Sequence, residues 1–258
     1  MLLAIDVGNT NIVLGVFEGK TLEHSWRLAT IRERTADELG LLIEGLFANG
    51  HVAHSRIDGI ILGSVVPPLT STMQGMAKRY FGLPALTVEP GTRTGMPILY
   101  DNPAEVGADR IVNAIAAYER FGRDAGAPLI VLDFGTATTF DAVSARGEYL
   151  GGAICPGVQI SADALFQRAA RLPRIDVRKP ATIVGRTTIG AMESGLFYGY
   201  VGMVEGLIRR MGDELGGGAM CVATGGLAEV IAPETPLIQH VDPDLTLQGL
   251  RIVWERNQ

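Results

Sequence analysis

The chain has 258 residues, of which 47% are apolar and 19% charged, a composition typical of globular proteins and far from that of disordered ones. Its formal net charge of −6 argues against a nucleic-acid-binding surface, which normally carries a basic excess. The two cysteines are too few for a disulfide framework, and no apolar run approaches the roughly 20 residues of a membrane span, so we expect a cytoplasmic protein that binds neither nucleic acids nor membranes.

The first half of the chain predicts alternating strands and helices. Residues 2–7 are an apolar run, and residues 12–17 are rich in β-branched and large apolar side chains. Residues 35–49 carry leucine and isoleucine at helical spacing, with Thr35 and Glu38 placed as a capping box. In chain order we predict strands at 2–7, 12–17 and 21–28, a helix at 35–49, a strand at 57–66, a helix at 69–81 and a strand at 86–88.

The second half of the chain begins in the same way as the first. Residues 129–143 repeat the order of residues 3–13: an apolar strand, an Asp, a Gly two residues later, small polar residues and a second apolar strand. Repeats of this size indicate two related lobes rather than a solenoid, whose period would be about 20–50 residues. We predict an α/β protein with lobes at residues 1–121 and 122–258, each with a mixed five-stranded sheet in βββαβαβ order.

Two turns of the form Asp-x-Gly are candidate phosphate-binding elements. In the first, Gly8 lets a bound group approach the backbone, and residues 9–11 supply amide and hydroxyl donors. Asp6 would hold Mg²⁺ directly or through water, because this ion keeps several waters and takes only one or two carboxylates. Residues 133–139 repeat the design in the second half. The alternative is that Asp-x-Gly at a strand end is simply a common turn.

A third candidate element is the glycine pair Gly225 and Gly226, which follows a strand predicted at 219–223 and precedes a helix. Paired glycines there would let the ring or sugar of adenosine lie close to the backbone. An ordinary tight turn between strand and helix is the alternative. Together with the two Asp-x-Gly turns, the pair completes the three-part pattern of actin-like phosphotransferases.

Between the two phosphate turns lies a segment suited to a phosphoryl acceptor. Residues 111–118 predict an Ala-rich helix, which leaves Gly107-Ala-Asp109-Arg110 at its N-terminus. Transfer to an alcohol needs a carboxylate that orients the hydroxyl and accepts its proton, so Asp109 is the candidate base. Arg110 would bind an anionic group through its planar guanidinium. Otherwise Asp109 caps the helix and Arg110 pairs with a surface acid.

Taken together, the motifs resemble those of type III pantothenate kinases from Leu3 to about Leu250. The motifs that carry the resemblance are Asp6-Val-Gly-Asn-Thr-Asn11, Gly107-Ala-Asp-Arg110, Asp133-Phe-Gly-Thr-Ala-Thr-Thr139, Pro156-Gly157 and Thr224-Gly-Gly226. That family phosphorylates pantothenate with ATP to 4'-phosphopantothenate, the first committed step towards coenzyme A. The resemblance implies a homodimer on a duplicated ribonuclease-H-like (actin-like) fold, with Mg²⁺ and a monovalent cation, K⁺ or NH₄⁺, as cofactors.

The resemblance also implies roles for individual residues. Asp133 would hold the monovalent cation and Thr136 would contact ATP. Thr188 matches the family's pantothenate contact, in its own or the neighbouring subunit's site, although Thr187 stands where the family often has Asn or Asp. The ATP phosphates would be held by Asp6, Val7, Gly8, Asn9, Thr10, Asn11, Ile12 and Val13, and pantothenate by Tyr100, Gly107, Ala108, Asp109 and Arg110, with Asp109 as catalytic base.

Two other functions fit parts of the same pattern. An actin-like kinase acting on a sugar, acetate or another small alcohol would need the duplicated Asp-x-Gly turns but not Tyr100 or Gly107 to Arg110. A nucleotide-binding accessory factor for gene expression would keep the fold without the chemistry. An intact Asp109 beside both turns favours an enzyme.

Overall fold

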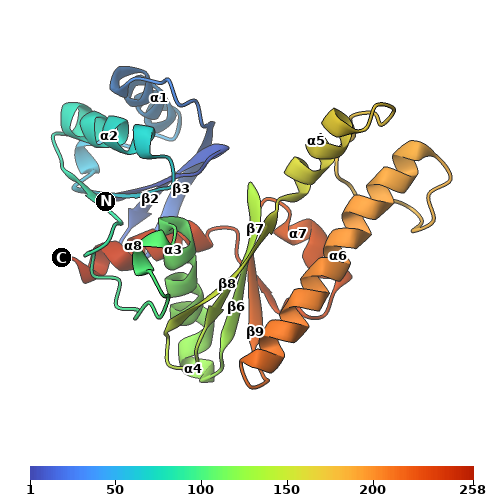
Figure 1. Ribbon diagram of the computed structural model, residues 1–258. Coiled ribbons are helices and arrows are strands. Elements are labelled where there is room, and N and C mark those ends of the chain that lie inside the picture. The colour runs from blue at the N-terminus through green and yellow to red at the C-terminus, as the bar shows by residue number, and fades with distance from the viewer. The chain divides into compact units, whose positions relative to one another are not determined.

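The computed structural model describes all 258 residues, and they divide into two compact units. Unit 1 comprises Met1–Ala116 together with Asp244–Gln258, and unit 2 comprises Ala117–Pro243. Each unit contains one mixed sheet of five strands, shown as a ribbon in Figure 1. No helix combines the length and the apolar character that crossing a membrane requires.

Unit 1 is built on a sheet with the strand order β3-β2-β1-β4-β5. The central strand β1 pairs antiparallel with β2 and parallel with β4, which brings Asp6 opposite both Val13 and Gly63. The predicted capping box of Thr35 and Glu38 is confirmed at the start of α1. The elements of the unit are β1 (Leu2–Val7), β2 (Asn11–Glu18), β3 (Thr21–Ala29), α1 (Ala36–Asn49), β4 (Gly59–Ser64), α2 (Pro67–Met76), β5 (Ala85–Thr87), α3 (Ala108–Ala117) and α8 (Leu245–Arg256).

Helices cover both faces of this sheet. On one face, Leu3, Ile5 and Val7 of β1 pack into a buried core with apolar side chains of α1 and α2. On the other face α8 contacts β1, β2 and β4, and glycines make room for it: a Cβ at Gly15 would lie 2.9 Å from Cδ1 of Leu247. Strands buried on both faces are apolar throughout, which explains the continuous apolar run of β1.

Unit 2 repeats this sheet with the order β10-β9-β6-β7-β8. Its central strand β6 pairs antiparallel with β7 and parallel with β9, as β1 does with β2 and β4, so the predicted duplication of the sheet is confirmed. The elements are α4 (Arg123–Ala125), β6 (Leu129–Phe134), β7 (Ala137–Val143), β8 (Tyr149–Pro156), α5 (Val158–Arg168), α6 (Thr188–Glu214), β9 (Met220–Gly225), α7 (Ala228–Ile231) and β10 (His240–Val241).

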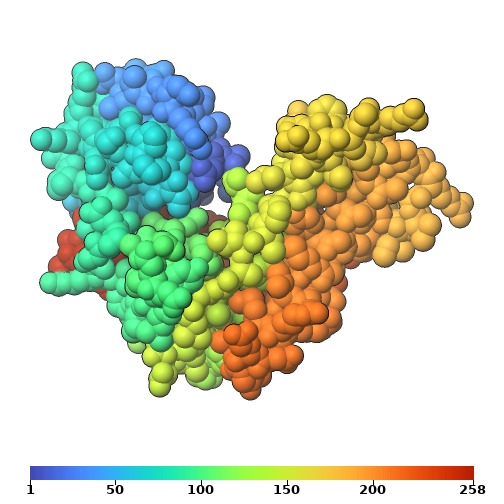
Figure 2. Space-filling view, in the orientation of Figure 1, coloured from blue at the N-terminus to red at the C-terminus, as the bar shows by residue number.

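Two helices, α5 and α6, stand between the third and fourth strands of unit 2, where unit 1 has α1 and a short 3-10 helix, His54–Arg56. Within unit 2, α5 and the first turns of α6 extend beyond the end of the sheet (Figure 1). Their atoms, coloured yellow to orange, lie on the visible surface in Figure 2. Residues 181–189, which lead into α6, are exposed apart from the half-buried Gly185.

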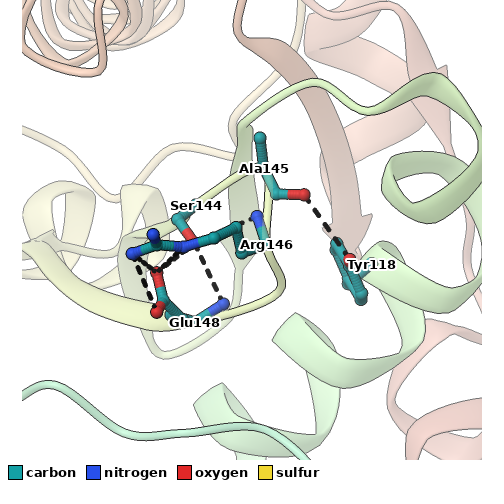
Figure 3. Close-up of polar contacts among 5 residues, drawn as sticks. All are labelled: Tyr118, Ser144, Ala145, Arg146 and Glu148. Carbon is teal, nitrogen blue, oxygen red and sulfur yellow. Dashed lines mark hydrogen bonds and ion pairs between the residues drawn. The ribbon is translucent and has the colours of Figure 1, made fainter.

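The turn between β7 and β8 is closed by side chains of its own residues (Figure 3). Arg146 Nη2 donates to both carboxylate oxygens of Glu148 at 3.1 Å, and Ser144 Oγ donates to Glu148 Oε2 at 2.8 Å. Tyr118, one of the first residues of unit 2, donates from its hydroxyl to the carbonyl oxygen of Ala145 at 3.5 Å. The ring of Tyr118 also fills the space beside Gly147, whose φ is +78°. The turn at Arg146 and Gly147 is therefore also a contact point for the segment that enters unit 2.

Several element boundaries differ from those predicted. The fourth strand is shorter, Gly59–Ser64, because Pro67 and Pro68 already belong to the first turn of α2, where proline needs no hydrogen-bond donor. Helix α3 starts at Ala108 rather than at residue 111, which places Asp109 and Arg110 inside its first turn. The division into lobes 1–121 and 122–258 stays a prediction. The contacts between residues assign α8, near the C-terminus, to unit 1.

Candidate functional site

The first Asp-x-Gly turn connects β1 and β2. The amide of Gly8 donates to the carbonyl oxygen of Asn11 at 3.0 Å, and a Cβ at Gly8 would lie 3.1 Å from that oxygen. Gly8 is therefore needed for the close approach of the two backbone strands. Asn9 and Thr10, at the tip, are exposed and present their polar groups to solvent.

Two residues beyond the motif hold this turn. The hydroxyl of Thr30, just after β3, donates to the carbonyl oxygen of Gly8 at 2.7 Å, and the Thr30 amide donates to the carbonyl oxygen of Thr10 at 2.9 Å. Arg32 Nη2 donates to Asn9 Oδ1 at 3.3 Å, which puts a guanidinium beside the turn. Sequence reasoning missed both residues, because only the pairing of β2 with β3 brings them to the turn.

Asp6 is half-buried at the end of β1, and the end of this strand is connected to the start of α3 in unit 1. The amide of Val65 donates to the carbonyl oxygen of Val7 at 3.0 Å. Cγ1 of Val65 in turn lies 3.5 Å from the position that a Cβ on Gly107 would occupy. The first phosphate turn and the start of α3 are thus joined through one residue, so unit 1 brings Asp6 and the Gly107–Arg110 motif into one neighbourhood.

The second Asp-x-Gly turn connects β6 and β7 in unit 2. It is one residue shorter than the first, because Phe134 pairs with Thr138, whereas Val7 pairs with Ile12. The Gly135 amide donates to the carbonyl oxygen of Ala137 at 3.0 Å, and the Gly157 amide donates to that of Thr136 at 3.1 Å. Thr136 is exposed at the tip, as Asn9 and Thr10 are in the first turn.

Asp133 lies between two glycines. A Cβ at Gly225 would come within 2.6 Å of Asp133 Oδ1, and one at Gly135 within 3.6 Å. Gly225 also has φ +90°, a conformation that side-chain-bearing residues rarely adopt. Within unit 2, the Asp133 carboxylate and the carbonyl oxygen of Phe134 both lie 2.6 Å from the Cβ position of Gly225. The close approach of adenosine to the pair at 225 and 226 stays a prediction. Gly226 is exposed, with nothing near its Cβ position.

The acceptor segment, defined here as residues 93–113, belongs to unit 1. Tyr100 is half-buried in it. Asn102 shapes the turn that follows, since its Oδ1 accepts from the Ala104 amide at 3.3 Å and its Nδ2 donates to Glu105 at 2.8 Å. Helix α3 then begins, and Arg110 in its first turn is only 8% exposed.

The Asp109 carboxylate accepts a hydrogen bond from the Arg110 amide at 2.8 Å, within the first turn of α3. Burial raises the pKa of Asp109, and the hydrogen bond and the charge of Arg110 offset this only in part. A carboxylate with a raised pKa is a stronger base, which is the property that accepting a hydroxyl proton requires. The carboxylate thus accepts a hydrogen bond at the helix start and has a raised pKa, and its role as base stays a prediction.

Thr187 and Thr188 have different positions at the start of α6. The hydroxyl of Thr187 accepts from the Gly190 amide at 3.0 Å and is the helix N-cap. Thr188 is the first residue of the helix and is exposed. The capping contact therefore engages Thr187 and not Thr188.

The acidic residues of the chain do not gather into a dedicated metal cage. No group of three or more His, Cys, Asp or Glu side chains is placed to hold an ion. Asp6 is a single carboxylate at the end of β1. Asp133, with its space provided by Gly135 and Gly225, is the equivalent carboxylate of unit 2.

Solved structures of other proteins share the fold of this chain. The chain is similar to an inorganic polyphosphate/ATP-glucomannokinase from Arthrobacter sp. strain KM, with a TM-score of 0.52 and 13% identity over 100% of this chain and 99% of that one. It is also similar to a Campylobacter jejuni protein assigned to the Baf family of transcriptional activators, with a TM-score of 0.62 and 19% identity over 99% and 98%. At these identities the likeness shows the fold alone. The chain has the fold of the actin-like kinases, as predicted.

Sequence relatives narrow the class to one family. The model of the type III pantothenate kinase family matches residues 2–210. The type III pantothenate kinase of Koribacter versatilis is 54% identical over 100% of this chain and 96% of its own length. That of Myxococcus xanthus is 55% identical over 100% and 99%. The chain belongs to the type III pantothenate kinase family, which confirms the resemblance predicted from the motifs.

Proposed function

We propose that the chain transfers the γ-phosphoryl group of ATP to pantothenate, giving ADP and 4'-phosphopantothenate in the first step of coenzyme A synthesis. Membership of the family over the whole chain supports this proposal. The structural observation that supports it most is Asp109, a carboxylate with a raised pKa at the start of α3, joined through Val65 to the first phosphate turn.

In the proposed reaction the hydroxyl oxygen of pantothenate attacks the γ-phosphorus, the bond to the β–γ bridging oxygen breaks, and ADP leaves. Asp109 orients the hydroxyl and accepts its proton. Tyr100 and residues 107–110 bind the acceptor, and Arg110 supplies positive charge at the start of α3. Residues 6–13, with Asn9 and Thr10 exposed at the tip of the turn, hold the ATP phosphates, with Arg32 beside them.

The cofactors of the reaction are Mg²⁺ and a monovalent cation. Mg²⁺ would neutralise charge on the β- and γ-phosphates, with Asp6 as its protein carboxylate, directly or through water. Asp133 would hold K⁺ or NH₄⁺, and the room beside its carboxylate that Gly225 provides supports this assignment. Thr136, Gly225 and Gly226 would contact ATP from unit 2.

The experiment that tests the function is a coupled ADP-release assay with pantothenate, with and without K⁺. Wild type should release ADP in proportion to pantothenate, and Asp109→Asn should lose activity by about 10²–10⁴-fold. Asp101→Asn is a matched control, because Asp101 is an exposed aspartate of the same segment. Turnover with a sugar or acetate but not with pantothenate would favour the other acceptor classes, and no turnover with any acceptor would favour an accessory factor.

A homodimer is part of the proposal. Large apolar side chains are exposed on the outer surface of unit 2, and such groups of apolar side chains are typical of interfaces. Thr188 lies within the same stretch of chain, which supports a contact with the neighbouring subunit's site. The exposed large apolar residues of unit 2 are Leu150, Ile154, Ile160, Leu165, Phe166, Ile183, Val184, Ile189, Val230 and Val241.

Light scattering tests the dimer. Val184 is 74% exposed and Ile183 65%, so an Ile183→Asp/Val184→Asp variant should fold and run as a monomer. Leu41→Asp is the control, since Leu41 is 64% exposed on α1 of unit 1. A dimer that survives the double substitution would place the interface elsewhere.

A cytoplasmic location is also proposed, and the unpaired thiols of Cys155 and Cys221 support it.

A further inference from the structure

Helix α8 contacts the acceptor segment at both of that segment's ends. Near its start α8 lies against α3, which carries Asp109. At its end α8 and the residue after it lie against Arg93, Thr94 and Gly95. All of these residues belong to unit 1. A single helix thus touches the segment on both sides of Tyr100.

The first contact at the end of α8 is made by Arg256. Its Nη1 donates to the carbonyl oxygen of Thr94, and its guanidinium lies flat beside Gly95. A Cβ at Gly95 would fall 2.9 Å from Nη1 and 3.0 Å from Cζ, and Gly95 has φ +66°. Glycine suits this position for two reasons: it adopts the positive φ, and its lack of a Cβ leaves space for the guanidinium.

The second contact is made by Asn257, the residue that follows α8. Its Oδ1 accepts from the Arg93 amide at 3.2 Å, and its Nδ2 donates to the Arg93 carbonyl oxygen at 3.0 Å. The same Nδ2 donates to the Val253 carbonyl oxygen at 2.8 Å, in the last turn of α8. One side chain thus ties the segment's backbone to the end of the helix.

The contact near the start of α8 fixes the other end of the segment. Thr246 Oγ1 donates to Asn113 Oδ1 at 2.7 Å, and Asn113 is 2% exposed. Gly249 of α8 lies against the backbone of Val112, where no side chain would fit. Helix α3, with Asp109 in its first turn, is therefore packed on α8 through buried groups.

We propose that Arg256 and Asn257 are positioning residues for the phosphoryl acceptor. They fix residues 93–95 to α8, and the loop that runs from there to Tyr100 is thereby held in the arrangement that binds the acceptor. The identity of that acceptor rests on the proposed function. Residues 88–102 form no helix or extended strand of their own, so external contacts must restrict the conformations of this long loop.

The physical consequence is a selective loss of acceptor affinity when the contact is removed. A loop that samples several conformations binds with an affinity reduced by the fraction in the competent one. Asp109 remains fixed through Asn113 and Val112, so the chemical step is retained. The phosphate turn at residues 8–11 is held by Thr30 and not by α8, so ATP binding is retained too.

The kinetic test uses Arg256→Ala and Asn257→Ala in the full chain, with Glu255→Ala as control. Glu255 is the neighbouring residue, and its ion pair with Arg251 lies within α8. We expect KM for pantothenate to rise about fivefold or more in both variants, with kcat and KM for ATP within about twofold of wild type. Arg256→Lys should recover part of the loss, because lysine keeps a donor but not the planar group.

A second readout does not depend on activity. Hydrogen–deuterium exchange of the amides of residues 91–100 should become about tenfold faster in Arg256→Ala and Asn257→Ala, but not in Glu255→Ala. Gly95→Ala disturbs the contact from the loop side and should give the same pattern if Arg256→Ala fails to fold.

The outcomes separate the positioning role from the proposed function. Unchanged pantothenate KM and unchanged exchange would overturn the positioning role, and so would an equal rise of both KM values, which indicates general destabilisation. If wild type shows no turnover with pantothenate, the proposed function fails. The exchange experiment still decides whether Arg256 and Asn257 hold the segment.

Discussion

The Asp109 carboxylate lies directly against the Cα of Gly107, so that a Cβ at Gly107 would come within 2.5 Å of Asp109 Oδ1. No heavy atom can occupy that position without moving the carboxylate. Gly107 thus has a steric role towards the candidate base, in addition to the acceptor contact that the family resemblance implies.

Gly107→Ala should therefore reduce kcat by moving Asp109 off its position. A misplacement of about 1 Å in a reacting group can cost roughly 10²-fold in rate, and we expect a loss of this order. Gly75→Ala is the control, because Gly75 is exposed on α2 and its Cβ position makes only an ordinary contact, 3.9 Å from Ala36 Cβ. Steady-state ADP release measures both. A Gly107→Ala enzyme with wild-type kcat would show that Asp109 is not the base or is free to adjust.

Asp109→Asn should stabilise the fold at neutral pH while reducing turnover by about 10²–10⁴-fold. Burial raises the folded-state pKa of Asp109 above its unfolded value, so the native state binds the proton more tightly. The free energy of unfolding therefore falls as pH rises from the unfolded pKa through the folded one, and asparagine removes this cost. The Tm of Asp109→Asn should exceed that of wild type at pH 7, and the difference should vanish below the ordinary aspartate pKa.

The exposed Asp101 provides the control for this pH series. Asp101→Asn should leave Tm unchanged across the same range. A lower Tm for Asp109→Asn at pH 7 would contradict the assignment of burial as the dominant influence on the carboxylate. The kcat of the wild type should also rise with pH, with an apparent pKa above the usual aspartate range.

Gly225→Ala should weaken the response to the monovalent cation. The substitution introduces strain at φ +90° and puts a Cβ 2.6 Å from Asp133 Oδ1. Gly217→Ala is matched for strain, since Gly217 has φ +85° but nothing within 4 Å of its Cβ position. Both variants should lose about 1–3 kcal/mol of stability.

Only Gly225→Ala should raise the K⁺ concentration that gives half-maximal turnover, by about tenfold or more. K⁺ titrations of ADP release for the two alanine variants and wild type make the comparison. Equal K⁺ responses in Gly225→Ala and Gly217→Ala would remove Asp133 from the cation site.

Tyr149→Phe should destabilise unit 2. The hydroxyl of Tyr149 donates to Asp141 Oδ1 at 2.6 Å, and both residues are buried, at 0% and 1% exposure. Removing a donor from a buried charged acceptor costs about 1–3 kcal/mol. Urea unfolding measures the loss, and Tyr198→Phe, a half-buried tyrosine packed edge-on against Phe197, should change stability far less.

The sheets and the phosphate turns were predictable because local pattern determines them. Both copies place an Asp at the end of an apolar strand and a Gly two residues on, and the structure pairs both strands alike. The capping box of Thr35 and Glu38 was predictable for the same reason, since its two residues lie only three positions apart in the sequence.

Other features depend on contacts between residues far apart in the chain. Thr30 reaches Gly8 only through the pairing of β2 with β3, and a threonine after a strand carries no signal of its own. Strand β10 has two residues, too few for a periodic pattern. The packing of α8 on unit 1 was not predicted, because the glycines that admit it, such as Gly15 and Gly59, are spaced along other elements.

The return of α8 to unit 1 has a consequence for synthesis on the ribosome. Residues 245–256 are translated after the whole of unit 2. The face of the first sheet that α8 covers, which includes Gly15, Gly59 and Gly63, therefore stays uncovered while some 130 residues are translated. At roughly 5–20 residues per second this interval lasts on the order of ten seconds. During it, the earliest-made part of the chain is the last to finish folding and the part most in need of protection by chaperones.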